Sequence, residues 1–434
     1  MTANSLSSSG FFPLEYSGYN RNDEGTSNLF LCQVAARTPG GEYLRRFWQP
    51  ICLLAELGDV PRRERALGEE LVVFRDKSGR VGVLHLACCH RGTSLEFARI
   101  EQCGIRCCYH GRLFDVDGRI LEVLGEPHAE KIKSRVSQGA YPVHIFAGIV
   151  FAYMGPPEFK PTFPIFDHFD VPGVRLALPQ RLPFACNWVQ VKENALDPAH
   201  TAVLHAWEDR FADQFGVFPE FEFSEGPGGA FYLAVRKVGD KIWIRSTSIV
   251  IPNVHIISSV LENGKVAKNV APPYLSFFTV PTDDTHCVTF AIPHVTDGES
   301  LERRMAFGWL GTGQTDERPY RERQKVPGDY DAQVGQGPIE KHSKENLGYH
   351  DRGVLLFRRI LRRGIEAVQK GEPIPGLIEG VIPSFGTDRV IFASEVNGNT
   401  DDPEVLRNLA RETATQYLKN PPMQQLKKYA GPSY

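Results

Sequence analysis

Two short cysteine–histidine motifs constrain the fold of this chain more than any other feature. Residues 88–92 read CCHRG and residues 107–111 read CCYHG. Each motif carries a cysteine and a histidine at close spacing, C-x-H in the first and C-x-x-H in the second, and glycine follows soon after. Thiolates and imidazoles are common ligands of zinc and of iron–sulfur clusters. Neither motif has four ligands by itself, so the fold is expected to bring both loops together.

The ligands predicted from these loops are Cys88, His90, Cys107 and His110. In a Rieske [2Fe–2S] cluster, two histidines replace two of the cysteines on one iron, which raises the reduction potential. A structural zinc site is the alternative, but zinc motifs usually pair cysteine with cysteine and histidine with histidine. The mixed pairs therefore favour the Rieske cluster. Such a cluster passes single electrons and does not bind substrate, so the chain must contain or supply a second redox site.

The composition excludes several classes of protein. The chain has 434 residues, enough for two domains. Its 42% hydrophobic and 23% charged residues are typical of a soluble globular protein. A formal net charge of −3 with both signs interspersed indicates neither a nucleic-acid surface nor a membrane patch, and no apolar run is long enough to cross a bilayer. The N-terminus lacks a secretory signal, and the cysteines outside the motifs are scattered. We therefore expect a cytoplasmic protein with free thiols.

Strand, helix and turn patterns predict an α+β fold in three parts. Residues 1–40 are expected to form a loose N-terminal arm, residues 41–160 a small all-β domain with both motifs in its loops, and residues 161–434 a larger domain with an antiparallel sheet and helices. The predicted strands are 71–74, 81–86, 113–116 and 148–153 in the small domain and 231–237, 241–251, 275–280 and 287–292 in the large one. The predicted helices are 42–48, 194–205, 351–367 and 402–418. Residues 311–342 are rich in Gly, Pro and charge and are predicted to be a long loop.

A third motif, D-x-x-H-x(4)-H, begins at Asp197 and includes His200 and His205. Two neutral imidazoles and a carboxylate form the facial triad of a non-haem Fe(II) site, which leaves positions open for oxygen and substrate. Positions five apart point about 140° away from each other on an ideal helix. The two histidines can therefore share one iron only if the helix is distorted, for example by a π-bulge. The alternative is two ordinary surface histidines.

In combination, the three motifs resemble those of the catalytic α subunits of Rieske non-haem iron oxygenases. The stretches at residues 42–50 and 337–348 look most like the phthalate 4,5-dioxygenase group, and the resemblance covers roughly residues 40 to 370. It implies a small all-β Rieske domain followed by a helix-grip-like catalytic domain with a mononuclear iron. It also implies that Cys88 and Cys107 hold the buried iron of the cluster and that His90 and His110 hold the outer one.

The resemblance further implies roles for residues of the large domain. His200 and His205 would hold the mononuclear iron, with a third ligand from an aspartate that opens a later helix. Asp351 fits this description, and Glu345, Asp331 and Asp388 are the alternatives.

Asp197 would bridge His200 to the cluster ligand His110 of a neighbouring subunit, in a head-to-tail homotrimer. The alternative for Asp197 is a helix N-terminal aspartate. Arg245 sits where related enzymes grip a substrate carboxylate, although an arginine on a strand often lies on a solvated face.

The function implied is that of a terminal oxygenase in a multicomponent system. A separate NADH-dependent reductase would deliver electrons to the cluster, because the chain has no flavin or nicotinamide motif. The mononuclear iron would use O2 to hydroxylate an aromatic compound, expected to be an aromatic acid. Monooxygenation, including oxidative O- or N-demethylation, is the alternative outcome within the family. A pure electron-transfer Rieske protein and a zinc-stabilised binding module are the alternatives outside it.

Overall fold

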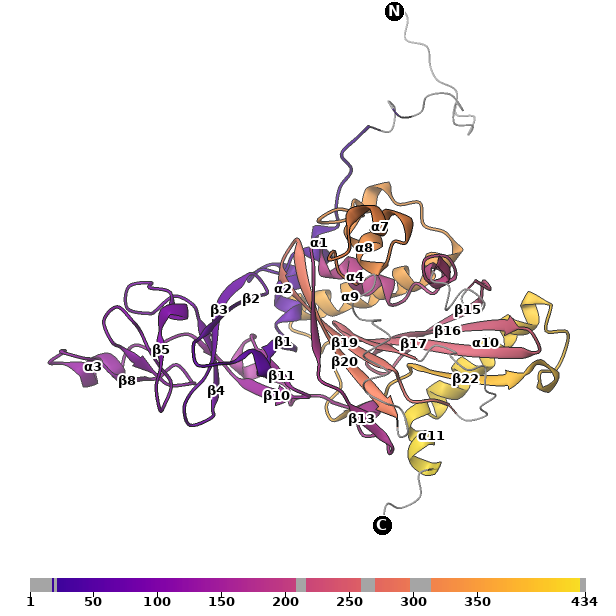
Figure 1. Ribbon diagram of the computed structural model, residues 1–434. Coiled ribbons are helices and arrows are strands. Elements are labelled where there is room, and N and C mark those ends of the chain that lie inside the picture. The colour runs from indigo at the N-terminus through magenta and orange to yellow at the C-terminus, as the bar shows by residue number, and fades with distance from the viewer. Residues whose placement is uncertain (1–17, 19–21, 208–215, 259–269, 297–313, 430–434) are drawn as a thin grey trace, which may run out of the picture.

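The chain folds into a small β-rich part and a larger part built on one long sheet (Figure 1). The computed structural model describes residues 18, 22–207, 216–258, 270–296 and 314–429. The small part, coloured indigo to purple, extends to one side of the long sheet. This arrangement confirms the predicted α+β class. The boundaries predicted near residues 40 and 160 stay a prediction.

Three antiparallel sheets make up the small part. Their orders are β2-β3-β4-β9, β5-β6-β7-β8 and β1-β11-β10. The strands are β1 (Trp48–Leu53), β2 (Arg62–Ala66), β3 (Glu69–Arg75), β4 (Val81–His85), β5 (Arg99–Ile100), β6 (Ile105–Arg106), β7 (Leu113–Phe114), β8 (Ile120–Glu122), β9 (Ala140–Tyr141), β10 (Val143–Phe146) and β11 (Ile149–Tyr153). A short helix, α3 (Ala129–Lys133), follows β8. The four strands predicted in this region are confirmed.

A separate hydrophobic core lies under the two cysteine–histidine loops. Phe74, Phe114 and Ile105 are buried in it together with Cys88 and Cys107. The alternation of apolar residues along these short strands places one side of each strand in this core. The cysteines are therefore anchored in a packed interior, which fixes the position of both loops.

The larger part is built on a nine-stranded antiparallel sheet with the path β13-β20-β19-β18-β17-β16-β15. That path contains seven of the nine strands, and the other two are β14, which pairs with β20, and β22, which pairs with β17. The strands are β13 (Val174–Leu176), β14 (Gln180–Phe184), β15 (Glu220–Gly226), β16 (Gly229–Val238), β17 (Lys241–Val250), β18 (Val254–Ile257), β19 (Leu275–Asp283), β20 (His286–Thr296) and β22 (Thr387–Phe392). A parallel pair, β12 (Ile165–Phe166) and β21 (Val381–Ile382), lies apart from this sheet. The four strands predicted in this region are confirmed.

Helices cover both faces of the long sheet. The helices are α1 (Leu29–Cys32), α2 (Pro39–Leu44), α4 (Trp188–Asn194), α7 (Tyr320–Lys325), α8 (Asp329–Val334), α9 (Arg352–Lys370), α10 (Pro403–Lys419) and α11 (Pro422–Tyr429). On β16, Tyr232 and Ala234 join the core that contains α4 and α9, whereas Phe231 and Leu233 join the core that contains α10. Figure 1 shows α4, α8 and α9 grouped on one side of the sheet. We call the face toward α4 and α9 the inner face.

Two of the predicted helices are confirmed with their caps. Asp351 is the N-cap of α9, and the side chain of Asp402 accepts a hydrogen bond from the amide of Glu404 at the start of α10. The predicted helix over residues 42–48 is instead α2, which begins at Pro39 and ends before the strand that starts at Trp48. No helix in the described ranges is long and apolar enough to span a bilayer.

Three other expectations were wrong. Residues 194–205 do not form one helix: α4 ends at Asn194, and short 3-10 turns cover His200–Ala202 and His205–Trp207. The segment 311–342 is not a plain loop, because α7 and α8 lie within its described residues. The described part of the arm is not loose either. The amide of Thr26 donates to Ser343, and the amide of Val34 donates to Asp284.

Glu69 stabilises the contact between α2 and the small sheets. Its carboxylate accepts hydrogen bonds from Arg45, at 2.7 Å, and from Tyr141, and it lies 3.6 Å from the His85 ring. Burial raises the pKa of Glu69, but hydrogen bonds from His85, Tyr141 and Arg45 outweigh burial and hold the pKa at about 2. A carboxylate whose pKa falls on folding adds stability above its unfolded pKa near 4.5, and that stability is lost as the pH drops toward 2.

Glu69→Gln is therefore expected to lower the free energy of unfolding by about 2 kcal/mol at pH 7. The difference from wild type should shrink between pH 4.5 and about 2, where the wild-type carboxylate takes up its proton. Glu70→Gln is the matched control, because the neighbouring Glu70 makes exposed ion pairs with Arg63 and Arg65. Urea unfolding across this pH range measures both variants. A loss for Glu69→Gln that does not change with pH would contradict this account.

Candidate active site

The two cysteine–histidine loops have the same backbone geometry. In each loop the cysteine amide donates to the carbonyl five residues later, at 2.9 Å for both Cys88 and Cys107. The glycine amide donates back to the cysteine carbonyl, at 2.8 Å for Gly92 and 3.1 Å for Gly111. The φ angles of these glycines are +75° and +67°, in the left-handed region that glycine adopts without strain. Two similar loops therefore face the space between them.

Within that space the sulfur and nitrogen donors are separated. Cys88 and Cys107 are each only 4% exposed, whereas His90 and His110 are exposed and their rings lie 4.6 Å apart. A Rieske cluster needs this separation, because one iron takes two thiolates and the other takes two imidazoles. A single zinc would need all four donors close together. In the described part of the chain, no three of these four donors have their ligand atoms within 4.8 Å of one another. The donor set therefore fits a two-iron cluster and does not fit one zinc ion.

Gln138 holds the first loop in place, and the sequence did not reveal it. Its Oε1 accepts from the Cys89 amide at 2.7 Å, and its Nε2 donates to the carbonyls of His85 and Ala87. The side chain is almost fully buried. A glutamine in a loop is usually exposed, so only the folded structure identifies this contact.

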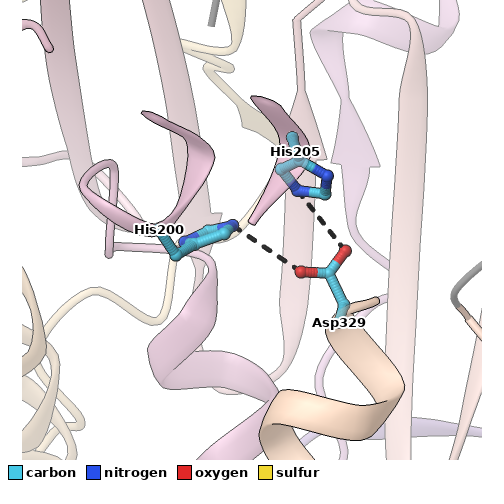
Figure 2. A group of neighbouring side chains, drawn as sticks. All are labelled: His200, His205 and Asp329. Carbon is cyan, nitrogen blue, oxygen red and sulfur yellow. Dashed lines mark ion pairs between the residues drawn. The ribbon is translucent and has the colours of Figure 1, made fainter. Parts of the chain in front are cut away.

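A second group of metal-binding side chains lies in the large domain. His200, His205 and Asp329 each offer a ligand atom, and these atoms lie within 4.8 Å of one another. Figure 2 shows both imidazoles pointing toward the carboxylate. The Nε2 atom of His200 lies 3.7 Å from Asp329 Oδ1, and the Nε2 atom of His205 lies 3.6 Å from Asp329 Oδ2. Two imidazoles and one carboxylate are the ligands of a facial-triad Fe(II) site.

The local fold explains how histidines five residues apart can converge. Each histidine begins its own 3-10 turn, one at His200 and one at His205, after the chain has left α4. The ring centroids lie 5.3 Å apart. The predicted distortion by a π-bulge within one helix is therefore wrong, because a break between two short turns brings the rings together instead.

The structure corrects the prediction that Asp351 is the third ligand. Asp351 occupies the N-cap position of α9, where its Oδ2 accepts from the preceding Gly348 amide at 2.6 Å, and it does not lie in the group with the two histidines. Asp329 lies there instead, as the first residue of α8. This aspartate does open a later helix, as expected. That helix is α8, which lies in a Gly- and Pro-rich segment that was predicted to be a loop.

The three alternatives to Asp351 have other partners. Asp331 forms ion pairs with Arg318 and Arg323. Glu345 pairs with Arg358, and Asp388 lies opposite Arg245 in the register of β22 and β17.

Polar side chains surround the three donors. Asn194 Nδ2 lies 3.4 Å from Asp329 Oδ1, and Gln314 Nε2 donates to Asp329 Oδ2 at 2.6 Å. Asp197 Oδ2 lies 3.4 Å from Nδ1 of His200, the ring nitrogen that faces away from Asp329. Carboxylates behind a ligand histidine fix its tautomer and raise its basicity. Burial raises the pKa of Asp329, but His205 and His200 outweigh burial and lower it, so the carboxyl stays ionised.

A buried arginine supports the turn that carries His200. Arg236, only 1% exposed, donates to Thr201 Oγ1 at 2.8 Å and to the Val217 carbonyl at 2.9 Å. Thr201 in turn donates to the Pro198 carbonyl. Arg236 was missed in the sequence, because nothing in it distinguishes a buried arginine on a strand from an exposed one.

Thr201→Val is expected to lower the affinity for iron by about 10- to 100-fold, because it removes a supporting contact behind a metal ligand. It should also destabilise the fold by about 1–3 kcal/mol, because it leaves a buried arginine donor without its acceptor. Thr413→Val is the matched control, since Thr413 is a buried threonine of α10 that donates to the Leu409 carbonyl. Iron retention after dialysis and thermal unfolding distinguish the two effects. Equal iron retention in both variants would contradict the supporting role.

Arg245 does not lie on a solvated face. It is 6% exposed on the inner face of β17, and its NH1 donates to the hydroxyl of Tyr232 at 2.9 Å. It is therefore a buried cation of the catalytic sheet.

Comparison with known proteins agrees with these observations. Residues 47–135 match the Rieske [2Fe-2S] domain family. The chain is 39% identical to the tert-butanol monooxygenase / tert-amyl alcohol desaturase oxygenase subunit of Aquincola tertiaricarbonis, over 92% of this chain and 90% of that protein. The chain belongs to the Rieske oxygenases. It is an oxygenase (α) subunit, so the resemblance to Rieske non-haem iron oxygenases is confirmed.

Two other relatives are dioxygenase subunits, and one of them comes from the phthalate 4,5-dioxygenase group that the sequence resembles. The α subunit of phenoxybenzoate dioxygenase from Ectopseudomonas oleovorans is 37% identical, with 79% of this chain and 85% of that protein covered. The oxygenase subunit of phthalate 4,5-dioxygenase from Pseudomonas putida is 33% identical, with 82% and 89% covered. The solved structure of dicamba monooxygenase bound to dicamba has the same fold, with a TM-score of 0.58 at 18% identity over 76% of this chain and 99% of that one.

Proposed function

We propose that this Rieske oxygenase subunit holds a mononuclear Fe(II) through His200, His205 and Asp329 and hydroxylates an aromatic acid with O2. The observation that carries this proposal is the convergence of two imidazoles and one carboxylate in Figure 2. A ferrous ion held in this way would keep coordination positions open for oxygen and substrate.

Neighbouring side chains would fix the orientation of the proposed iron ligands. Asn194 and Gln314 hold the Asp329 carboxylate from both of its oxygens, which leaves it little freedom to rotate. Asp197 faces Nδ1 of His200 and so keeps Nε2 directed toward the metal position.

We further propose that electrons come from a separate NADH-dependent reductase and enter through the Rieske domain, where His90 and His110 are exposed. Asp197, whose side chain is 28% exposed, would meet His110 of a neighbouring subunit in a homotrimer. The proposal also includes domain boundaries near residues 40 and 160 and a cytoplasmic location. None of the nine cysteines forms a disulfide, which supports a reducing compartment.

The buried Arg245 favours an anionic substrate, because bidentate arginine is a natural partner of a carboxylate. The names of the phenoxybenzoate and phthalate dioxygenases are those of enzymes that act on aromatic acids. A second candidate substrate class is the tertiary alcohols, which is favoured by the 39% identity to the tert-butanol monooxygenase subunit.

The test uses the purified, iron-loaded protein, reduced chemically and exposed to labelled O2. The substrate panel contains aromatic acids, methoxy-aromatics and tert-butanol, and mass spectrometry identifies the products. We expect labelled oxygen in an aromatic acid: two atoms identify a dioxygenase, and one atom or release of formaldehyde identifies a monooxygenase or demethylase. Label in tert-butanol alone would favour the second candidate. No incorporation in any compound, with both iron centres loaded, would leave a pure electron carrier and contradict the proposal.

A further inference from the structure

Lys192 is a fully buried lysine whose amine has no hydrogen-bond partner. It lies on α4, two residues before Asn194, and its exposed fraction is 0%. Its Nζ contacts no acceptor among the described residues, and it takes part in none of their ion pairs. An amine buried in this way costs free energy unless a partner is supplied. Such a residue needs an explanation other than packing, because methionine or leucine would fill the same volume without that cost.

Among the described residues, no carboxylate acts on this amine. Burial lowers the pKa of Lys192 to about 7, and the titrating neighbour that affects it most is the thiol of Cys287 on β20. Burial and a hydrogen bond with Cys186 hold the pKa of Cys287 well above its usual value, so that thiol is neutral. On β18, burial lowers the pKa of His255 well below its usual value, and the nearby charges of Lys192, Arg245 and His200 lower it further. These neighbours are neutral or basic.

The inner face of the sheet adds more hydrogen-bond donors to the same region. Thr247 is paired with Tyr232, which lies on the inner face, in the β16–β17 register. Arg245, two residues earlier on β17, therefore lies on the same inner face. The Thr247 hydroxyl is buried and has no hydrogen-bond partner in the part of the chain that the structure describes. Next along the same face, Ile249 is paired with His255 of β18. The amine of Lys192 and the hydroxyl of Thr247, neither of which has a hydrogen-bond partner among the described residues, therefore lie on the side of the sheet that also carries Arg245, whose NH1 donates to Tyr232.

We propose that Lys192 binds the carboxylate of the substrate in the interior between α4 and the β17–β18 face. This inference rests on the proposed function and names the group of the substrate that the protein recognises. A carboxylate offers acceptors to Lys192 and Thr247, and it supplies a negative charge beside the Lys192 amine, which has no acceptor among the described residues. The charges of Lys192 and His200 both act on His255, so an acid held at Lys192 would lie close to the proposed iron site.

The test compares binding of benzoate with binding of benzamide, a neutral molecule of nearly the same shape. Isothermal titration calorimetry on the iron-loaded protein at pH 7 measures affinity without turnover. Lys192→Met keeps most of the side-chain volume and removes the amine. We expect benzoate affinity to fall at least 10-fold in this variant, benzamide affinity to change less than threefold, and both iron centres to remain. Lys237→Met is the matched control, since Lys237 pairs with Asp401 at the surface and should leave both affinities unchanged.

Several results would overturn the inference. These are an equal loss of both ligands, unchanged benzoate binding, wild-type protein that does not bind benzoate, and competition by acetate as strong as that by benzoate. The last result would identify a general anion site with no role in recognising a substrate. A second measurement uses buffers of different ionisation enthalpy. Wild-type protein should take up a proton with benzoate because the amine becomes charged as it pairs, and Lys192→Met should not.

The outcome is independent of the proposed function. Wild-type protein that incorporates labelled oxygen into neutral compounds but does not bind benzoate would contradict the role of Lys192 and leave the oxygenase standing. Benzoate binding that depends on Lys192, without any oxygen incorporation, would support the role of Lys192 and contradict the proposed oxygenase reaction.

Discussion

Replacing Asp329 with alanine is expected to remove the mononuclear iron and to reduce turnover by at least about 1,000-fold. The reason is the ligand count: two histidines alone leave a divalent iron with too few protein donors and no compensating negative charge. The Rieske cluster should stay intact, because its loops are anchored in a separate core of the small domain. Iron analysis and the visible spectrum of the cluster measure these two effects separately.

Asp351→Ala is the matched control for this prediction. Asp351 is also an aspartate at a helix start, but it caps α9 and does not lie with the histidines. Its loss removes the hydrogen bond from the Gly348 amide, which should cost about 1 kcal/mol of stability and leave the iron content unchanged. Loss of iron in Asp351→Ala with retention in Asp329→Ala would restore the ligand predicted from the sequence and contradict the arrangement in Figure 2.

Asp197→Asn is expected to keep both metal centres but to slow electron transfer from the cluster by about 100-fold or more. The asparagine preserves the shape of the side chain and removes the negative charge that faces Nδ1 of His200. Oxidation of the reduced cluster after rapid mixing with O2 and substrate, followed by visible absorbance, measures this rate.

The control for Asp197 is Asp401→Asn, which removes an exposed carboxylate that pairs with Lys237. Its cluster should be oxidised at the wild-type rate. Wild-type oxidation in Asp197→Asn as well would mean that electrons do not depend on this carboxylate, and the proposed contact between neighbouring subunits would lose its main support.

The parts of the site that could be predicted from the sequence are those encoded locally. Cys88, His90, Cys107 and His110 lie in two short loops whose spacing is specific. His200 and His205 were likewise recognisable from one short motif, although their geometry was not. The turn between them depends on where α4 ends, and helix boundaries are the least predictable feature of a sequence.

The position of Asp329 beside the two histidines could not be predicted, because only the tertiary fold brings it there. Asp329 opens a six-residue helix inside a stretch whose glycines and prolines resemble a loop. Asp351 opens a long helix with a clear apolar stripe, so the sequence favoured it.

Burial was the other property hidden in the sequence. Lys192, Arg236 and Gln138 belong to residue types that are usually exposed, and their positions give no sign that they lie in the interior. Gln138 and Arg236 make hydrogen bonds that only the folded structure reveals. Lys192 has a buried amine without a partner among the described residues, which the sequence does not reveal either.

Mössbauer spectroscopy of the ⁵⁷Fe-loaded protein, with the cluster oxidised and the mononuclear iron ferrous, tests the central claim most directly, because both cluster irons are then ferric and only mononuclear iron gives a ferrous signal. We predict a high-spin ferrous doublet with about one third of the total iron in wild type and in Asp351→Ala. The same doublet should be absent from Asp329→Ala, while the cluster signals remain. A wild-type spectrum with cluster iron only, or an undiminished ferrous doublet in Asp329→Ala, would contradict the assignment of His200, His205 and Asp329 as the iron site.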